Sequence, residues 1–527
     1  MDAGRLMPGA EALPMPLQVP FCDKSVVAET AQDFVLPDYQ PEIRKLLRVS
    51  ASLTPPGKFL GTGEAEFAGN AELCALYIGA DGHLYSAPLT LPYEFKLPYE
   101  GDERFGGEQV AVDATVVPDA LIVRVLAPRK LSVRVRLRAR VTGRCREDIS
   151  ARTEGGAGQE PLQRLTRVRE CAVVSCGVGE AVTVTDSFSP EMTGDTLRII
   201  ESRAQALVSE ASPVDTGISC RGEVYLEVLY GFDEDETGMP QSMVRRIPFR
   251  VEVPLATDNV GNTGEACAFA ACTAVNCRVE DGKILCAVTL TPTARLTGTD
   301  KVTFVGDCYS VEHETACTEQ TYSYLRPLAS YNGNMTHTAT LPLKEAGMPE
   351  GAVAFDTDGE VSGVQARVDR GRIVLEGDGH YTTLWRQADG DMGSADYHVP
   401  WRYEISCEQT KGVPDGTALV AHMHLCILTA RVRTEGENLS LDAEWAVCAA
   451  VYLPESEKSV AVVTVGEPLS ADRACFTLCY PASDQTLWSV GKKYHVAVRA
   501  LAGANALSGA LDADAPGSLE GAKYLII

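Results

Sequence analysis

The sequence lacks an export signal and any segment that could span a membrane. Its first twenty residues, MDAGRLMPGAEALPMPLQVP, have no basic head followed by an apolar run, so they do not form a signal peptide. No stretch approaches the roughly 20 uninterrupted apolar residues of a transmembrane helix. We therefore expect a cytoplasmic chain with no membrane span.

Positive charge is also scarce. The 527 residues include 47 Lys and Arg against 72 Asp and Glu, which gives a net charge of −25. A field of this sign repels nucleic acid and anionic membranes, so we expect neither as a partner. The excess of acid favours simple solubility, with an acidic face for a basic partner as the alternative.

The motifs of the common enzyme classes are missing. The 17 cysteines include no CxxC pair, and the chain contains no GxSxG. Cys267, Cys272 and Cys277 recur every five residues, which no zinc knuckle does, so we expect them to be buried in a strand. His422 and His424 share one face of a strand but have no third ligand at a recognisable spacing, and we expect them to face solvent. The sequence predicts no enzyme, no metal and no cofactor.

The chain does contain one strand pattern three times over. A strand ends in an aromatic residue, an acidic or Gly-containing connection follows, and a second strand opens with Pro, which breaks no ladder bond there. Each copy then continues into a second pair of strands with period-two alternation. The aromatic and proline marks are Tyr77 and Pro92, Tyr230 and Pro248, and Trp385 and Pro400.

One of these later strands carries a row of arginines. Arg134, Arg136, Arg138 and Arg140 alternate with apolar residues, which indicates a half-buried strand with a basic outer face. Without interleaved aromatics, and in an acidic chain, this row favours pairing with Asp and Glu neighbours over nucleic-acid binding.

These patterns predict a mainly β fold of three β-rich, sandwich-like modules and a small helical C-terminal domain. The expected divisions are a tail over 1–20, a first module over 21–145, a linker over 146–165, a second module over 166–310, a third over 311–456, a linker over 457–475 and a final domain over 476–527.

The modules resemble SPOCS domains, which occur in clostridial spore-coat proteins. The resemblance rests on FVLPDYQPEIRKLLRVSASL (34–53) and the Leu-Tyr and Leu-Pro-Tyr hairpin after it, with looser copies at SFSPEMTGDTLRIIESRAQA and ATLPLKEAGMPEGAVAFDTDGEV. The last 52 residues resemble a LysM domain, a βααβ module. That resemblance implies strands over 476–480 and 523–527, and helices over 486–494 and 498–504. Asn505 would close the second helix, as a residue that tolerates the left-handed turn.

The LysM resemblance also implies a binding surface. It would comprise the loop before the first helix, the outer side of that helix and the loop after the second. The residues are Asp484, Gln485, Thr486, Trp488, Lys492, Lys493, Asn505, Ala506 and Leu507.

Within this surface we expect Trp488 to be at least partly exposed, as an aromatic anchor whose replacement by Ala weakens partner binding. The alternative is that Trp488 covers the domain's own core. The family's usual Gly-Asp-Thr is Asp484-Gln485-Thr486 here, and its Pro-Gly is Glu520-Gly521, so glycan binding is in doubt and protein binding is favoured.

The combination of SPOCS-like repeats with a LysM-like domain implies a coat-morphogenesis scaffold. Such a protein would sit in the mother-cell cytoplasm at the forespore surface and bind the morphogenetic ATPase of the coat basement and other coat proteins. Two alternatives stay open. One is an envelope protein that binds peptidoglycan or N-acetylglucosamine glycan, and the other is a hydrolase whose chemistry the sequence does not reveal.

The cysteines give a first prediction. Because the count is odd and an export signal is missing, we expect all 17 thiols to be reduced in the native protein. Thiol titration under denaturing, non-reducing conditions should return 17 free groups, and a much lower number would contradict a cytoplasmic location.

Overall fold

The computed structural model is built mainly of antiparallel strands. It describes residues 5–6, 15–61, 63–98, 110–154, 162–190, 197–232, 240–255, 264–470, 477–507, 514–515, 518–519 and 522–527. Strands account for 77% of the structure and helices for 4%, which confirms the mainly β class. In these ranges no helix is long and apolar enough to cross a membrane.

The first sandwich spans residues 16–148. Its strands are β2 (Pro16–Val35), β3 (Ile43–Leu53), β4 (Gly57–Gly61), β5 (Glu64–Gly79), β6 (Leu84–Pro98), β7 (Val110–Ala127) and β8 (Lys130–Asp148). One sheet has the order β2–β8–β7. In the other sheet β5 is central: it pairs with β3 and β4 along one edge and with β6 along the other. Strict alternation explains the packing, because every second residue of β6 from Leu89 to Leu97 is buried against β8.

Two further sandwiches repeat this plan. The second has β10 (Leu162–Val178), β11 (Val182–Phe188), β12 (Leu197–Val214), β13 (Gly217–Phe232), β14 (Gln241–Pro254), β15 (Glu265–Glu280) and β16 (Lys283–Ser310). The third has β17 (His313–Pro342), β18 (Val353–Asp369), β19 (Arg372–Arg386), β20 (Met392–Ser406), the 3₁₀ turn Glu408–Thr410, β21 (Val420–Glu435) and β22 (Asn438–Pro468). In each, the last strand pairs with both the first strand and the one before it, and a three-stranded meander lies between them in the chain: β3–β5–β6, β12–β13–β14 or β18–β19–β20.

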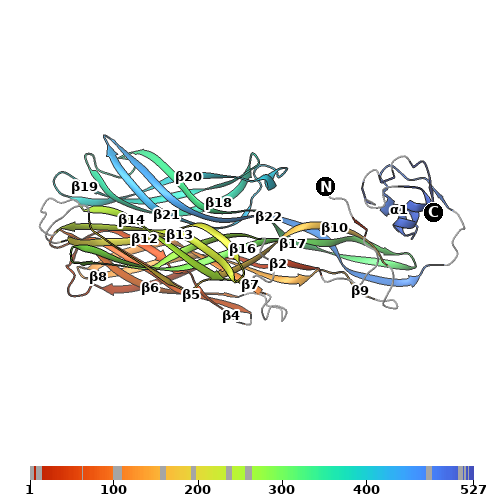
Figure 1. The fold of residues 1–527 in the computed structure, drawn as a ribbon, viewed down its shortest axis with the longest axis horizontal. Helices are drawn as coiled ribbons and strands as arrows, with labels where there is room; N and C mark the ends of the chain where they lie inside the picture. The colour runs from red at the N-terminus through yellow and green to blue at the C-terminus, as the bar shows by residue number, and fades with distance from the viewer. Residues whose placement is uncertain are drawn as a thin grey trace.

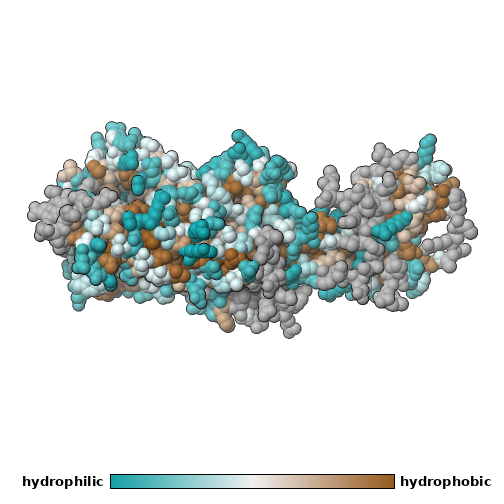
Figure 2. Space-filling model, in the orientation of Figure 1, coloured by the Kyte–Doolittle hydropathy of each residue, from teal (hydrophilic) through white to brown (hydrophobic). Residues whose placement is uncertain are grey.

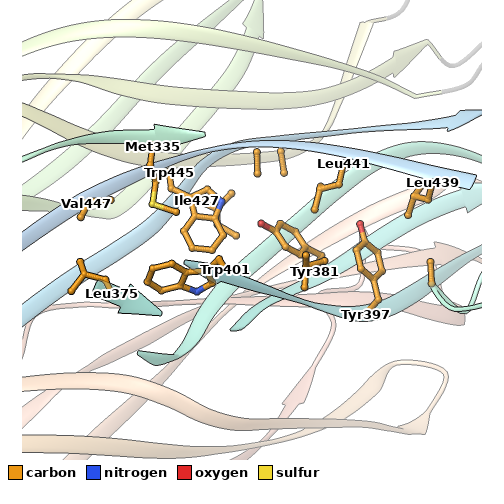
Figure 3. Close-up of a cluster of buried hydrophobic side chains, with 14 of the residues drawn as sticks. Met335, Leu375, Tyr381, Tyr397, Trp401, Ile427, Leu439, Leu441, Trp445 and Val447 are labelled. Atoms are coloured by element: carbon orange, nitrogen blue, oxygen red, sulfur yellow. The ribbon is translucent and has the colours of Figure 1, made fainter. Parts of the chain in front are cut away.

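The core of the third sandwich is the most aromatic. Trp401 and Trp445 meet edge to face with ring centroids 5.4 Å apart, and Tyr381 stacks on Tyr397 at 5.8 Å (Figure 3). All four side chains are buried between the meander and the β17–β22–β21 sheet. Rings of this size fill the space between two sheets and contribute through their geometry as well as their area.

The three meanders share one register. On the middle strand of each meander, the residue opposite the proline mark is Asn70, Glu223 or Asp378. The aromatic mark follows seven residues later on the same strand in all three, since 77 − 70, 230 − 223 and 385 − 378 are each 7. Each first strand also has a bulge beside the aromatic mark. The corresponding sets, with the bulged residue in the middle, are Leu46-Leu47-Arg48, Ile199-Ile200-Glu201 and Ala354-Phe355-Asp356.

These corresponding bulges meet where the three sandwiches join. Apolar residues from all three sandwiches form the junction, including Leu76, Leu229 and Leu384, which lie one residue before the aromatic marks. The full buried set is Leu47, Leu76, Ile78, Leu84, Ile200, Leu229 and Leu384.

Beside this junction lies a buried group of charges, which we call the ionic centre: Arg48, Glu201, Arg203, Glu227 and Asp356. Arg48 of the first sandwich is 2.5 Å from Glu201 of the second and 2.8 Å from Asp356 of the third. Arg203 donates to both carboxylate oxygens of Asp356, at 2.6 and 3.1 Å, and lies 3.0 Å from Glu227. Burial alone would raise the pKa of Asp356, but the two arginines outweigh it and lower that pKa to about 2.

The long strands extend beyond the sandwiches as a stalk, which we define as residues 162–172, 299–325 and 454–468. Apolar residues of all three sandwiches fill its core, among them Leu17, Phe304 and Tyr324. Two short strands join it, with β1 (Arg5–Leu6) antiparallel to β10 and β9 (Arg152–Glu154) parallel to β22. Figure 1 shows these strands reaching toward the C-terminal domain.

That domain has two short helices and a two-stranded sheet in the part of residues 477–527 that is described. The elements are β23 (Leu478–Cys479), α1 (Leu487–Lys493), α2 (Val498–Ala504) and β24 (Leu525–Ile526). β23 and β24 pair antiparallel, so the two ends of the domain lie together.

Three expected boundaries need correction. The linker expected over 457–475 is wrong for residues 457–468, because β22 continues through Ser456 to Pro468 as part of the stalk. The tail expected over 1–20 includes β1 and the start of β2 at Pro16. The linker expected over 146–165 includes the end of β8, all of β9 and the start of β10. Pairing between distant strands decided these positions, and no local composition signals it.

The arginine row on β8 is as expected, whereas the histidine pair is not. Arg134 pairs with Glu29 at 3.2 Å and lies half in solvent. His422 and His424 were expected to face solvent, but they point between the second and third sandwiches. His424 stacks on Phe269 at 4.0 Å, and burial lowers the pKa of His424 to about 4.

The ionic centre should be a large contributor to stability. Replacing Arg48 by Met leaves Glu201 and Asp356 with an uncompensated buried charge, which should cost about 3 to 5 kcal/mol. Urea denaturation of the two proteins checks this.

The control is Arg134→Met, which removes an arginine from a solvent-exposed pair and should cost less than about 1 kcal/mol. Equal losses in the two variants would contradict the importance of the ionic centre.

Candidate functional site

The first helix of the C-terminal domain begins with a well-formed cap. The Thr486 hydroxyl accepts a hydrogen bond from the Ser489 amide, and the Ser489 side chain accepts one from the Thr486 amide. This capping box fixes the start of α1, and the two lysines of its last turn suit the negative end of the helix dipole. Leu487 and Val490 are fully buried, as the helical spacing predicts.

Trp488 is buried, so the prediction of an exposed aromatic anchor is wrong. Its side chain is only 3% exposed and packs edge to face on Tyr309 of β16, with ring centroids 5.0 Å apart. Its indole nitrogen donates to Asp307 at 2.8 Å. Lys492 lies on the same side of α1 and donates to the same carboxylate at 2.6 and 2.8 Å. Trp488 and Lys492 therefore bind the protein's own stalk.

The stalk fits this helix closely. The Tyr309 hydroxyl donates to the Val496 carbonyl at 2.7 Å, and a Cβ added to Gly491 would lie 2.7 Å from that hydroxyl oxygen. His495 also makes a hydrogen bond with the Ser310 carbonyl at 3.0 Å. Gly491 thus permits Tyr309 to approach the helix backbone. We call residues 307–310 the docking platform.

The loop before α1 serves mainly to shape the domain. Asp484 is exposed, and the Gln485 side chain accepts a hydrogen bond from the Ala482 amide at 3.1 Å. The Thr486 hydroxyl, besides capping α1, lies 3.4 Å from Asp514. Of these residues, Asp484 presents its side chain to solvent.

The loop after α2 is tied to the sheet. The Asn505 amide nitrogen donates to the carbonyls of Leu501 and Ile526, and its oxygen accepts from the Ile526 amide. The left-handed residue expected at Asn505 is instead Ala506, with φ of 52°. Leu507 packs on the domain core, and Lys493 is exposed beside the Tyr494 ring. Phe476, Glu520 and Gly521 lie outside the described residues.

The sequence argument missed a different exposed surface. Leu478, Tyr480, Tyr524 and Ile526 are 45%, 73%, 53% and 37% exposed. We call them the β23–β24 face, because Leu478 is opposite Ile526 and each tyrosine is two residues away from one of this pair. In Figure 2 hydrophobic surface appears on this end of the molecule. The two-residue spacing was visible in the sequence, but without the pairing of the strands it could not be assembled into one face.

A cavity of about 1370 Å³ lies among the three sandwiches, beside the ionic centre. His380 and His398 in its wall stack at 4.6 Å, and the Glu360 carboxylate, 3.7 Å from His380, raises the pKa of His380. Its arginines Arg48 and Arg203 already pair with carboxylates. Among the described residues, no group of three or more His, Cys, Asp or Glu could hold a metal ion.

Comparisons with known proteins gave no match, whether the chain was compared with family models, with curated proteins or with solved structures.

Docking of the C-terminal domain gives a testable prediction. Replacing Asp307 by Ala removes the acceptor of Trp488 and the partner of Lys492, and hydrogen bonds to a charged group contribute about 1.5 to 3 kcal/mol. Amide hydrogen exchange across residues 487–496 should then become about tenfold faster or more.

Asp23→Ala is the control, because Asp23 makes a comparable exposed pair with Arg140 in the first sandwich. It should leave exchange in residues 487–496 unchanged. Unchanged exchange in Asp307→Ala would show that this contact does not hold the domain.

Proposed function

We propose that this chain is a non-enzymatic scaffold of spore-coat assembly whose C-terminal domain binds a coat-basement morphogenetic ATPase. The proposal combines the SPOCS-like and LysM-like sequence resemblances with the geometry of the chain. Three sandwiches with one common register suit SPOCS-like repeats, and the element order β23, α1, α2, β24 suits a LysM-like domain.

The observation that carries the proposal is the apolar β23–β24 face on a domain held at the end of a long body. Tyrosines on an exposed surface are typical anchors of protein interfaces, because they bury a large area and lose little conformational entropy. Docking of α1 on the stalk leaves this face open, with Tyr480 73% exposed. We therefore assign partner binding to the β23–β24 face and no longer to Trp488.

A scaffold of this kind would work in the mother-cell cytoplasm at the forespore surface. The long body would separate the C-terminal domain from other coat proteins that bind the sandwiches. The strong net negative charge suits a protein that must stay dispersed until it meets its partner.

Binding to peptidoglycan or N-acetylglucosamine glycan is the second candidate. The two exposed tyrosines favour it, since aromatic rings can stack on sugar faces. The changed loop at Asp484-Gln485-Thr486 and the fixed Asn505 side chain argue against it.

Single replacement of Tyr480 or Tyr524 by Ala should weaken binding of the ATPase at least about tenfold, because each removes an aromatic anchor from the interface. Titration of the ATPase with the full chain, followed by calorimetry or interferometry, measures this. Arg499→Ala is the control, because Arg499 is exposed on α2 and is not one of the four residues of this face, and it should leave affinity unchanged.

Insoluble peptidoglycan forms the second arm of the experiment. Retention of the full chain on peptidoglycan, lost in the tyrosine variants, together with no binding to the ATPase would overturn the scaffold proposal in favour of glycan binding. Equal affinity of the tyrosine variants and the native chain for the ATPase would remove the assignment to this face.

A further inference from the structure

Two thiols lie close together at the docking platform, one of them within it. The sulfur atoms of Cys308, near the end of β16, and Cys317, near the start of β17, are 3.6 Å apart. The strands belong to different sandwiches and to different sheets. Neither thiol has a part in the proposed binding of a partner.

Another close pair serves as a comparison. Cys277 and Cys286 are 2.8 Å apart and directly opposite in the β15–β16 hairpin. A bond there would join two residues that the strand ladder already holds together. A bond between Cys308 and Cys317 would instead connect the second sandwich to the third.

The Cys308–Cys317 pair is asymmetric, as a reactive dithiol requires. Cys317 is partly exposed, whereas Cys308 is fully buried. The hydrogen bond between the two thiols outweighs burial and lowers the pKa of Cys317 to about 7, and that same bond together with burial raises the pKa of Cys308. Cys317 is thus an accessible thiolate near neutral pH, with a second thiol beside it.

We propose that Cys308 and Cys317 form an intramolecular disulfide when the protein meets a low-molecular-weight disulfide such as oxidised glutathione. The Cys317 thiolate attacks one sulfur of the oxidant and releases the first glutathione thiolate. Cys308 then gives up its proton to solvent and attacks the Cys317 sulfur, which releases the second glutathione thiolate. Two protein thiols are oxidised, and one glutathione disulfide is reduced to two thiols.

The position of the pair links this bond to the C-terminal domain. Cys308 lies between Asp307 and Tyr309, which hold Trp488, Lys492 and Val496. Formation of the bond draws the two sulfur atoms from 3.6 Å to about 2.05 Å. The disulfide therefore ties the docking platform to β17 and restricts opening of this end of the stalk.

The sequence offers a direct assay on the full chain. Trypsin cleaves after Lys301 and next after Lys344, because Pro327 protects the bond after Arg326, and the peptide 302–344 contains Cys308 and Cys317 and no other cysteine. The folded chain is treated with oxidised glutathione, free thiols are alkylated, and the peptide is weighed. We expect the peptide to lose two hydrogens and to carry no alkyl group.

The rate of the reaction gives a second readout. With a pKa of about 7, the thiolate fraction of Cys317 rises about tenfold between pH 6 and pH 8, so formation of the disulfide should accelerate by about the same factor. Amide exchange in residues 302–326 should slow after oxidation, because the bond restricts opening of the stalk.

Serine variants separate the two roles. Cys308→Ser should leave Cys317 carrying one glutathione, because no second thiol displaces it. Cys317→Ser should leave Cys308 unmodified in the folded chain, because Cys308 is buried. Far-UV circular dichroism and the melting temperature identify any variant that fails to fold.

Two outcomes in the native chain would overturn the proposal. One is a peptide 302–344 that remains doubly alkylated after treatment. The other is a peptide that accumulates glutathione on Cys317 without an internal bond. The assay on the native chain needs no variant, so failure of a variant to fold leaves the test intact.

Discussion

The arrangement of the three sandwiches depends on the buried ionic centre. Corresponding positions beside the three bulges carry Arg48, Glu201 and Asp356. Three identical charges there would repel one another in a region that water cannot screen, whereas one cation among two carboxylates binds both. Arg203 adds a second cation, which lies 3.0 Å from Glu227. A buried ion pair is not by itself a large source of stability, but an unmatched charge there is costly, so the centre selects this order and orientation of the sandwiches over others.

This junction also explains why the middle meander is buried on both faces. Val224, Leu226 and Val228 pack in the core of the second sandwich, and Tyr225 and Leu229 pack against its neighbours. A meander of an isolated sandwich would expose one face to water. The second sandwich therefore requires the other two to cover the outer face of its meander, which is consistent with apolar residues on both faces of β13.

The sequence predicted those features that depend on local pattern. The aromatic and proline marks of each pattern lie within one hairpin of a three-stranded meander, and the LysM resemblance placed helices where α1 and α2 lie. The ionic centre was not predicted, since Arg48 and Asp356 are 308 positions apart (356 − 48) and each resembles a solvent-facing strand residue. The bulges that turn them inward have no evident sequence signal. Likewise, the long continuation of β22 depends on its pairing with β17.

The error over Trp488 shows where reasoning from a single domain fails. A tryptophan with a lysine one turn away does have the chemistry of a binding site, and it does bind an aromatic ring and a carboxylate. Those groups belong to Tyr309 and Asp307 of the same chain, and a domain considered alone cannot reveal them. Because the contact fixes α1 on the stalk, the β23–β24 face has a defined direction relative to the long body. An apolar face held in a fixed direction loses less entropy on binding than one on a tumbling domain, so docking of α1 would favour the partner binding that we propose for the β23–β24 face.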